Sequence, residues 1–280
     1  MELDERGPLD QELDVFGMTD VGKVRKRNED HFLICSLHKL MQVHSTSLPN
    51  LDQLPLSGEQ MAFLALVADG VGGHAGGDVA SRMATESVAR YITRSMQCYY
   101  TRDPNEDEFV DQLHDTVMQC HVDLLAEAAK RPKQGGMATT LTLFLGIWPR
   151  AFIVQVGDSR CYQLRGDKLN QITRDQTLSQ DLIDRGVLTP SKAGAYDHVL
   201  SSAVGGSTAE PVIYKMTLER DDVVLLCSDG LTTHVTDEQI RDGLIAMESS
   251  EQVCRKLVSM ALDRGGRDNI TVVIGRAKAT

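Results

Sequence analysis

Short apolar runs, separated by glycines and polar turns, alternate along this 280-residue chain with longer stretches that carry apolar residues at helical spacing. The short runs predict strands, and the longer stretches predict amphipathic helices. The predicted strands cover 13–18, 30–34, 64–68, 139–147, 151–156, 161–164, 169–172, 212–218, 222–227 and a last one that ends at 274. The predicted helices cover about 78–95, 107–131, 178–185, a segment that begins near 237, and 251–263.

The stretch from Phe63 to Gly77 combines both patterns. Five apolar residues, Leu64 to Ala68, predict a strand that is buried on both faces and ends on Asp69. Five glycines follow between positions 70 and 77, and they let the backbone come close to whatever the carboxylate holds. By itself the stretch is equally typical of a tight turn whose aspartate only caps a helix.

Other acidic residues stand in a similar context, at strand edges or strand ends beside glycine or a turn. They are Glu29 with Asp30, Asp158, Asp229 and Asp268. If the fold brings these carboxylates together they need a counter-ion, because two unit charges 4 Å apart repel by roughly 4 kcal/mol at an effective dielectric constant of 20. All-oxygen ligand sets favour hard cations such as Mg²⁺ or Mn²⁺, whereas no histidine or cysteine recurs at zinc spacing.

A basic cluster, Lys23, Arg25, Lys26 and Arg27, stands directly before Glu29 and Asp30. Such a cluster is usually a solvated turn. The alternative is an anion site beside a cation site, which phosphate-ester chemistry requires. In an extended chain Arg25 and Glu29 point to the face opposite Asp30, so the spacing alone does not decide between the two.

The composition restricts the class of protein. A net charge of −11 argues against nucleic acid or an anionic membrane as a partner. No apolar run approaches the roughly 20 residues of a membrane span, and the acidic N-terminus lacks the features of a signal peptide. Six scattered cysteines without a CxxC pair fit buried, reduced thiols. The sequence therefore predicts a cytoplasmic protein.

Six segments resemble, in order, the motifs of the metal-dependent protein phosphatases of type 2C, the PPM family. They are Arg25-Lys-Arg-Asn-Glu-Asp30, Val67-Ala-Asp-Gly-Val-Gly-Gly-His74, Gly136-Met-Ala-Thr-Thr140, Val156-Gly-Asp-Ser-Arg160, Ser228-Asp-Gly-Leu231 and Gly266-Arg-Asp-Asn269. The resemblance covers residues 14 to 276, and the glycine loop is most similar to the bacterial branch.

The resemblance implies an α+β fold, a four-layer α-β-β-α sandwich of two central antiparallel sheets flanked by helices, with a small helical flap. Residues 13–277 would form the catalytic domain, with an inserted loop at about 36–60 and the flap at about 176–198. Residues 1–12 are predicted to be a disordered acidic arm.

The resemblance also implies a metal site. Asp69 would bridge two Mg²⁺ or Mn²⁺ ions. Asp229 and Asp268 would complete the shell of one ion, and Glu29 with the carbonyl of Gly70 would complete the other. A third, weaker ion would use Asp158 together with Asp229.

The implied reaction is hydrolysis of phosphoserine and phosphothreonine in proteins by direct attack of a metal-bridging water or hydroxide. Arg25 would bind the phosphate of the substrate, and Asp30 would orient the water. The implied partners are phosphoproteins, such as a serine/threonine kinase or its targets, and the implied state is a monomer.

Departures from the family pattern leave alternatives open. Val71 stands where animal members carry a histidine as general acid, and His74 lies three residues further on. The flap is flanked by Asp175-Gln-Thr177, and the segment 198–205 lacks the usual arginine. The alternatives are a catalytically silent binding module of the same fold and a phosphatase acting on small phosphate esters.

Overall fold

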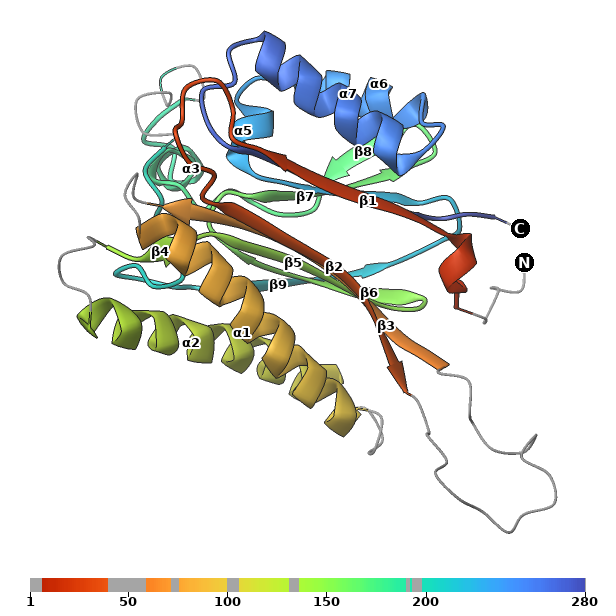
Figure 1. The fold of residues 1–280 in the computed structure, drawn as a ribbon, viewed down its shortest axis with the longest axis horizontal. Helices are drawn as coiled ribbons and strands as arrows, with labels where there is room; N and C mark the ends of the chain where they lie inside the picture. The colour runs from red at the N-terminus through yellow and green to blue at the C-terminus, as the bar shows by residue number, and fades with distance from the viewer. Residues whose placement is uncertain are drawn as a thin grey trace.

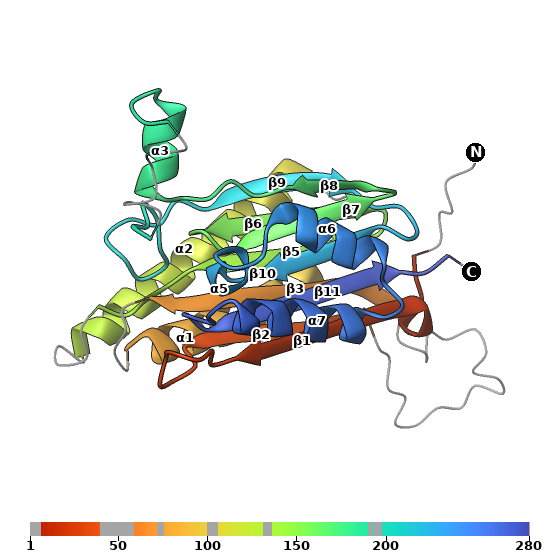
Figure 2. The same cartoon turned by 90° about the horizontal axis from the view of Figure 1, so that it is seen from above.

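The computed structural model of the chain describes residues 7–39, 59–71, 76–99, 106–130, 136–189, 192 and 198–279. Two antiparallel sheets face each other, and helices cover their outer faces (Figures 1 and 2). The predicted four-layer α-β-β-α sandwich is confirmed. Within these residues no helix combines the length and apolar character needed to cross a membrane.

The first sheet has the strand order β1-β11-β10-β7-β8, and each neighbouring pair is antiparallel. Its strands are β1 (Leu13–Asp20), β7 (Arg160–Arg165), β8 (Lys168–Gln171), β10 (Val223–Cys227) and β11 (Ile270–Ala277).

The second sheet has the order β2-β3-β5-β6-β9, with the short β4 paired to the end of β3. Its strands are β2 (Asp30–Lys39), β3 (Glu59–Val71), β4 (Ala138–Thr139), β5 (Leu141–Ile147), β6 (Arg150–Val156) and β9 (Val212–Thr217).

The helices fall into two layers and one projection. α1 (Gly76–Tyr99) and α2 (Glu106–Lys130) cover the second sheet, while α5 (Asp229–Thr232), α6 (Asp237–Ile245) and α7 (Ser250–Asp263) cover the first (Figure 1). α3 (Leu178–Asp184) projects from the sandwich (Figure 2), and the hydroxyl of Thr177 caps it by accepting from the amide of Gln180. α3 lies within the range predicted for the flap.

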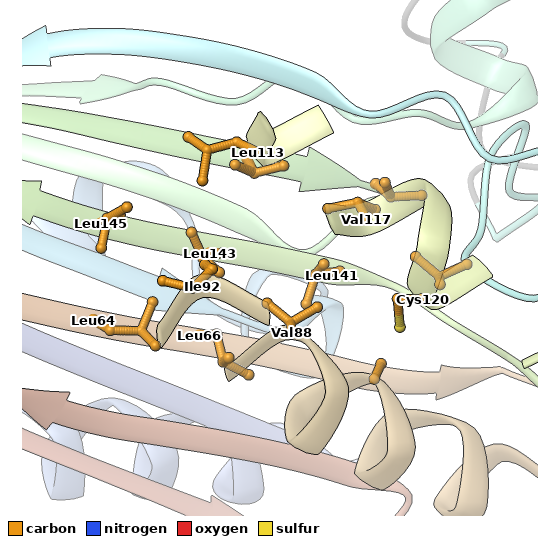
Figure 3. Packing of buried hydrophobic residues seen from close by; sticks show 14 of the residues in the cluster. Leu64, Leu66, Val88, Ile92, Leu113, Val117, Cys120, Leu141, Leu143 and Leu145 are labelled. Atoms are coloured by element: carbon orange, nitrogen blue, oxygen red, sulfur yellow. The ribbon is translucent and has the colours of Figure 1, made fainter. Parts of the chain in front are cut away.

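The apolar side chains form three layers between these elements. Because successive residues of a strand face opposite sides, Leu64 and Leu66 of β3 pack against the helices while Ala65 and Val67 pack against the other sheet. All four are at most 3% exposed, which confirms the predicted strand buried on both faces. Figure 3 shows the helix-facing layer, where α1 and α2 meet Leu64, Leu66 and β5.

Several boundaries differ from the sequence prediction. β2 and β3 pair along their length as far as Lys39 and Glu59, so the margins of the predicted loop at 36–60 are strand, and residues 40–58 lie outside the described residues. Within the predicted disordered arm, Asp10–Glu12 form a 3₁₀ turn whose Glu12 pairs with Arg220 at 3.0 Å. The fold therefore begins earlier than the apolar pattern indicates, because a short polar turn has no periodicity to reveal it.

The antiparallel topology places the predicted acids at one end of the sandwich. β2 starts at Asp30 where β3 reaches Asp69, β10 ends just before Asp229, and β11 starts just after Asp268. Asp158 lies in the turn between β6 and β7.

Candidate active site

Asp69 and Asp30 are directly opposite each other in the ladder of β2 and β3. Like charges at such a position destabilise a sheet, so the pair needs a separate explanation. The backbone of Asp69 is fixed, because its amide donates to Thr140 Oγ1 at 3.0 Å and its carbonyl accepts from Thr139 Oγ1 at 2.8 Å.

One oxygen of Asp30 is held by two hydroxyls. Oδ2 accepts from Ser228 Oγ at 2.8 Å and from Thr271 Oγ1 at 2.6 Å. Oδ1 is buried and has no hydrogen-bond partner among the described residues. Burial raises the pKa of Asp30 to about 6, the nearby charges of Asp229 and Asp268 also raise it, and the two hydroxyls oppose the rise.

The other acids of the group, which are buried or half-buried, repel one another in the same space. Burial raises the pKa of Asp69 well above its ordinary value, and the charges of Asp30, Asp229, Asp158 and Asp268 add to the rise. Burial also raises the pKa of Asp229, with Asp268 adding to it, and Asp229 Oδ1 is a second buried oxygen without a partner among the described residues. The pKa of Asp158 is raised by burial and by Asp229. Such a cluster must bind protons or cations.

Glu29 sits where three backbone segments approach closely. The amide of Gly70 donates to the Glu29 carbonyl at 3.1 Å, and Ser81 Oγ donates to the same carbonyl at 2.5 Å. A Cβ on Gly70 would lie 2.5 Å from the backbone of Gly77, and one on Gly77 would lie 2.7 Å from Glu29 Oε2. The Glu29 carboxylate therefore lies beside the first turn of α1, where negative charge is favourable. At position 70 only glycine fits without a shift of the backbone, and a side chain at position 77 would displace the Glu29 carboxylate.

Arg25 contacts the acid cluster from its exposed side. Its Nη2 lies 2.7 Å from Asp268 Oδ2, and the two side chains are 45% and 35% exposed. This hydrogen bond is the main cause that raises the pKa of Arg25. The guanidinium thus stands at the mouth of the cluster, where an anion can reach it.

Asn269 joins the two loops that carry these residues. Its side-chain oxygen accepts from the amide of Glu29 at 2.8 Å, and its side-chain nitrogen donates to the carbonyls of Val21 and Arg27 at 2.9 Å. Our sequence interpretation assigned no such role to Asn269, Ser228 or Thr271. The sequence feature that could have identified them is their position, since each lies within three residues of a predicted acid.

The structure gathers Asp30, Asp69, Asp158, Asp229 and Asp268 within electrostatic reach of one another, with the backbones of Glu29 and Gly70 beside them. Across the described ranges, no three His, Cys, Asp or Glu side chains are arranged closely enough to hold one ion. Asp30 and Asp268 are instead engaged by hydroxyls and by Arg25. The all-oxygen donor set and the two orphaned oxygens still fit a hard cation. His74 lies outside the described residues.

Comparison with known proteins identifies the family. The model of the protein phosphatase 2C family matches residues 43–270. The serine/threonine protein phosphatase PstP of Mycobacterium tuberculosis is 36% identical over 215 residues, which are 76% of this chain and 40% of that protein. The chain therefore spans only 40% of the length of this curated relative.

Two further matches extend over nearly the whole chain. The serine/threonine phosphatase stp of Listeria monocytogenes is 29% identical over 261 residues, covering 91% of this chain and 92% of that protein. A crystal structure of the catalytic domain of PstP in complex with two manganese ions has a TM-score of 0.73 and 31% identity, covering 95% of this chain and 99% of that one. Together with the fold and the acids at one end of it, these matches show that the chain belongs to the protein phosphatase 2C family.

Proposed function

We propose that this chain is a metal-dependent serine/threonine phosphoprotein phosphatase that hydrolyses phosphomonoesters. The observation that carries the proposal is the group of carboxylates with raised pKa values, in which the buried oxygens Asp30 Oδ1 and Asp229 Oδ1 have no partner among the described residues. Buried acids without a counter-charge cost stability, so their presence points to a ligand that is positively charged. The names of the relatives support the same reaction.

The proposed ligand is Mg²⁺ or Mn²⁺, with two ions in the core site. The crystal structure of the PstP catalytic domain in complex with two manganese ions supports this number. Asp69 would be shared between the ions, Asp229 and Asp268 would hold one, and Glu29 with the Gly70 carbonyl would hold the other. Asp158 with Asp229 would hold a third, weaker ion. Such ions neutralise phosphate charge and lower the pKa of water.

Two residues of the chain would act on the substrate and the proton. The planar guanidinium of Arg25 suits two phosphate oxygens at once, and it would exchange Asp268 for the phosphate. Asp30 would accept a proton at Oδ1, because Oδ2 is already occupied by two hydroxyls. In the metal-free protein burial raises the pKa of this carboxyl to about 6, which makes it a stronger proton acceptor than an exposed aspartate.

The proposed substrates are proteins that carry phosphoserine or phosphothreonine, including a serine/threonine kinase or its targets. We further propose that the protein acts as a monomer in the cytoplasm.

Hydrolysis of p-nitrophenyl phosphate and of a phosphothreonine peptide tests the proposal, with Mn²⁺, with Mg²⁺ and with EDTA. Turnover of both substrates that is lost in EDTA is the expected result. Turnover of p-nitrophenyl phosphate without turnover of the peptide would favour a small phosphate ester as substrate. No turnover with either metal, from folded protein, would contradict the proposal and favour the silent binding module.

A further inference from the structure

We infer that the mouth of the acid cluster carries a cationic rim that selects phosphorylated segments flanked by aspartate or glutamate. The rim consists of Lys23, Lys26, Arg27, Arg264 and Arg267, all of which are exposed. The inference rests on the proposed function, because the rim would bind residues beside the phosphoserine or phosphothreonine. The inference assigns a role to Lys23, Lys26 and Arg27, the residues of the basic cluster that do not bind the phosphate.

Two loops that are far apart in the sequence form the rim as one unit. The amide of Lys23 donates to the Gly266 carbonyl at 2.7 Å, and Asn269 donates to the carbonyls of Val21 and Arg27. A Cβ on Gly22 would lie only 2.2 Å from the Asp268 carbonyl oxygen, so the loops touch through their backbones. The two loops that carry the cations are therefore held against each other.

The rim cations are available to a ligand. In the described part of the chain, no ion pair joins Lys23, Lys26, Arg27 or Arg267 to an acid. Among the described residues, Arg264 is bound to two uncharged oxygens, those of the His234 carbonyl and the Gln239 side chain. This contrasts with Arg25, whose charge is paired with Asp268.

The local charge differs in sign from the charge of the whole chain. The two loops and the residues at their ends also carry Asp20, Glu29, Asp30 and Asp263. After Arg25 and Asp268 are paired, the five rim cations therefore exceed these four acids by one. The chain as a whole has a net charge of −11. Since an average surface of this protein repels acidic peptides, a local cationic surface beside the cluster favours binding of an acidic peptide at that place.

The rim lies within reach of residues next to the phosphorylated one. Lys23 and Arg27 are each two residues from Arg25, so their Cα atoms lie within about 7.6 Å of that of Arg25. Two residues of an extended peptide span about 7 Å. A phosphate on Arg25 therefore places flanking side chains two or three residues away beside the rim.

The test compares three phosphothreonine peptides with the full chain in Mn²⁺. The first has alanine at the flanking positions, the second has glutamate two and three residues away on each side, and the third has a second phosphoserine instead. Each exposed ion pair contributes a factor of about 1.5 to 5 in affinity. We therefore expect kcat/KM to be about tenfold higher for the glutamate peptide than for the alanine peptide at low salt, mainly through KM, and the preference to vanish near 1 M salt.

Neutralised variants identify the surface responsible. Lys23→Gln, Lys26→Gln and Arg27→Gln together should reduce the glutamate-to-alanine preference to about twofold or less. The matched control removes three exposed cations elsewhere, Arg90→Gln, Lys168→Gln and Lys256→Gln, and should retain the full preference. Because both variants change the net charge equally, any difference between them reports position.

The outcomes separate this inference from the proposed function. Equal turnover of the alanine and glutamate peptides would overturn the rim while the phosphatase stands, and a preference confined to the doubly phosphorylated peptide would overturn the choice of acidic residues. If no peptide is hydrolysed, the affinities of the same labelled peptides can be measured by fluorescence anisotropy. Tighter binding of the glutamate peptide that is lost in the Lys23/Lys26/Arg27 variant, but not in the control variant, supports the rim. Equal binding of the glutamate and alanine peptides overturns it.

Discussion

The two ends of β10 present the same residue type in opposite circumstances. Asp222 precedes the strand and is 5% exposed, yet both of its oxygens are occupied: Arg165 donates at 2.8 and 2.6 Å, Gln163 at 3.0 Å and the amide of Glu219 at 2.8 Å. Asp229 follows the strand, is half-buried among other acids, and keeps one buried oxygen without a partner among the described residues. The first carboxylate is satisfied by the protein, and the second is left for a ligand.

Structural acids elsewhere in this fold are also paired with arginine. Arg276 Nη2 lies 3.0 Å from Asp14 Oδ2, and Arg160 donates three hydrogen bonds of 2.6–3.1 Å to Asp175. The missing counter-charge at the Asp229 end is thus a local property of that end. This unbalanced charge supports the cation site proposed above.

The largest expected effect comes from Asp69→Asn. Removal of the shared carboxylate should reduce kcat with Mn²⁺ by more than about a thousandfold, since it would hold both ions. In EDTA the same variant should be as stable as the parent chain or more stable, because one buried, repelling charge is gone. Turnover assays and thermal unfolding in EDTA measure the two effects.

Asp222→Asn is the matched control at the other end of the strand. It removes hydrogen bonds to a charged group and should cost about 1–3 kcal/mol of stability, with kcat retained at a temperature where the variant is folded. If Asp69→Asn retains turnover, or lowers stability in EDTA as Asp222→Asn does, then the acids at the Asp229 end of β10 are structural, like Asp222, and do not hold a ligand.

The pH dependence of the metal-free protein gives the next largest effect. A folded pKa of about 6 for Asp30, against an ordinary 3.8, means that the folded state binds the proton more tightly than the unfolded state. The stability from this group is fully present below pH 3.8 and is lost as the pH rises through about 6, and the loss is about 3 kcal/mol.

Unfolding by urea in EDTA between pH 4 and 7.5 measures this loss, and excess Mn²⁺ should abolish it at pH 7.5 by neutralising the cluster. If the free energy of unfolding of the metal-free protein is constant or rises with pH over this range, the pKa of Asp30 is not raised in the folded state.

The sequence pattern predicted the strands and the acids, the family resemblance predicted the layered architecture, and neither predicted the hydrogen bonds that hold the acids in place. Alternating and helical periodicity located the strands, and strand ends followed by aspartate located Asp69, Asp158 and Asp229. Hydrogen bonds such as those of Thr271 and Ser228 to Asp30 join residues 241 and 198 positions away. A single hydroxyl has no periodicity, so only the assembled sandwich reveals its partner. The short helix α5, which begins at Asp229, was missed for the same reason.

Arg25→Ala sharpens the comparison of ion pairs. If Arg25 exchanges Asp268 for phosphate, the variant should raise KM for p-nitrophenyl phosphate about 10- to 100-fold with a smaller change in kcat, and Arg25→Lys should restore it only in part. The pair is about half exposed and should contribute less than about 1 kcal/mol to stability. An unchanged KM with lower thermal stability would make it a structural pair like that of Arg165.

The smallest effect is expected from Thr271→Val, which keeps the shape of the side chain and removes one of the two hydroxyls on Asp30. The hydroxyl favours the charged form of Asp30, so its loss should raise the pKa of that carboxyl further. We expect kcat near neutral pH to fall about three- to tenfold and the acidic limb of the pH profile of kcat to move to higher pH. Thr271→Ser retains a hydroxyl and should restore both. A fall in kcat without a shift of the acidic limb would mean that Thr271 supports only the packing of β11, and Asp30 would then not be the group whose proton is moved.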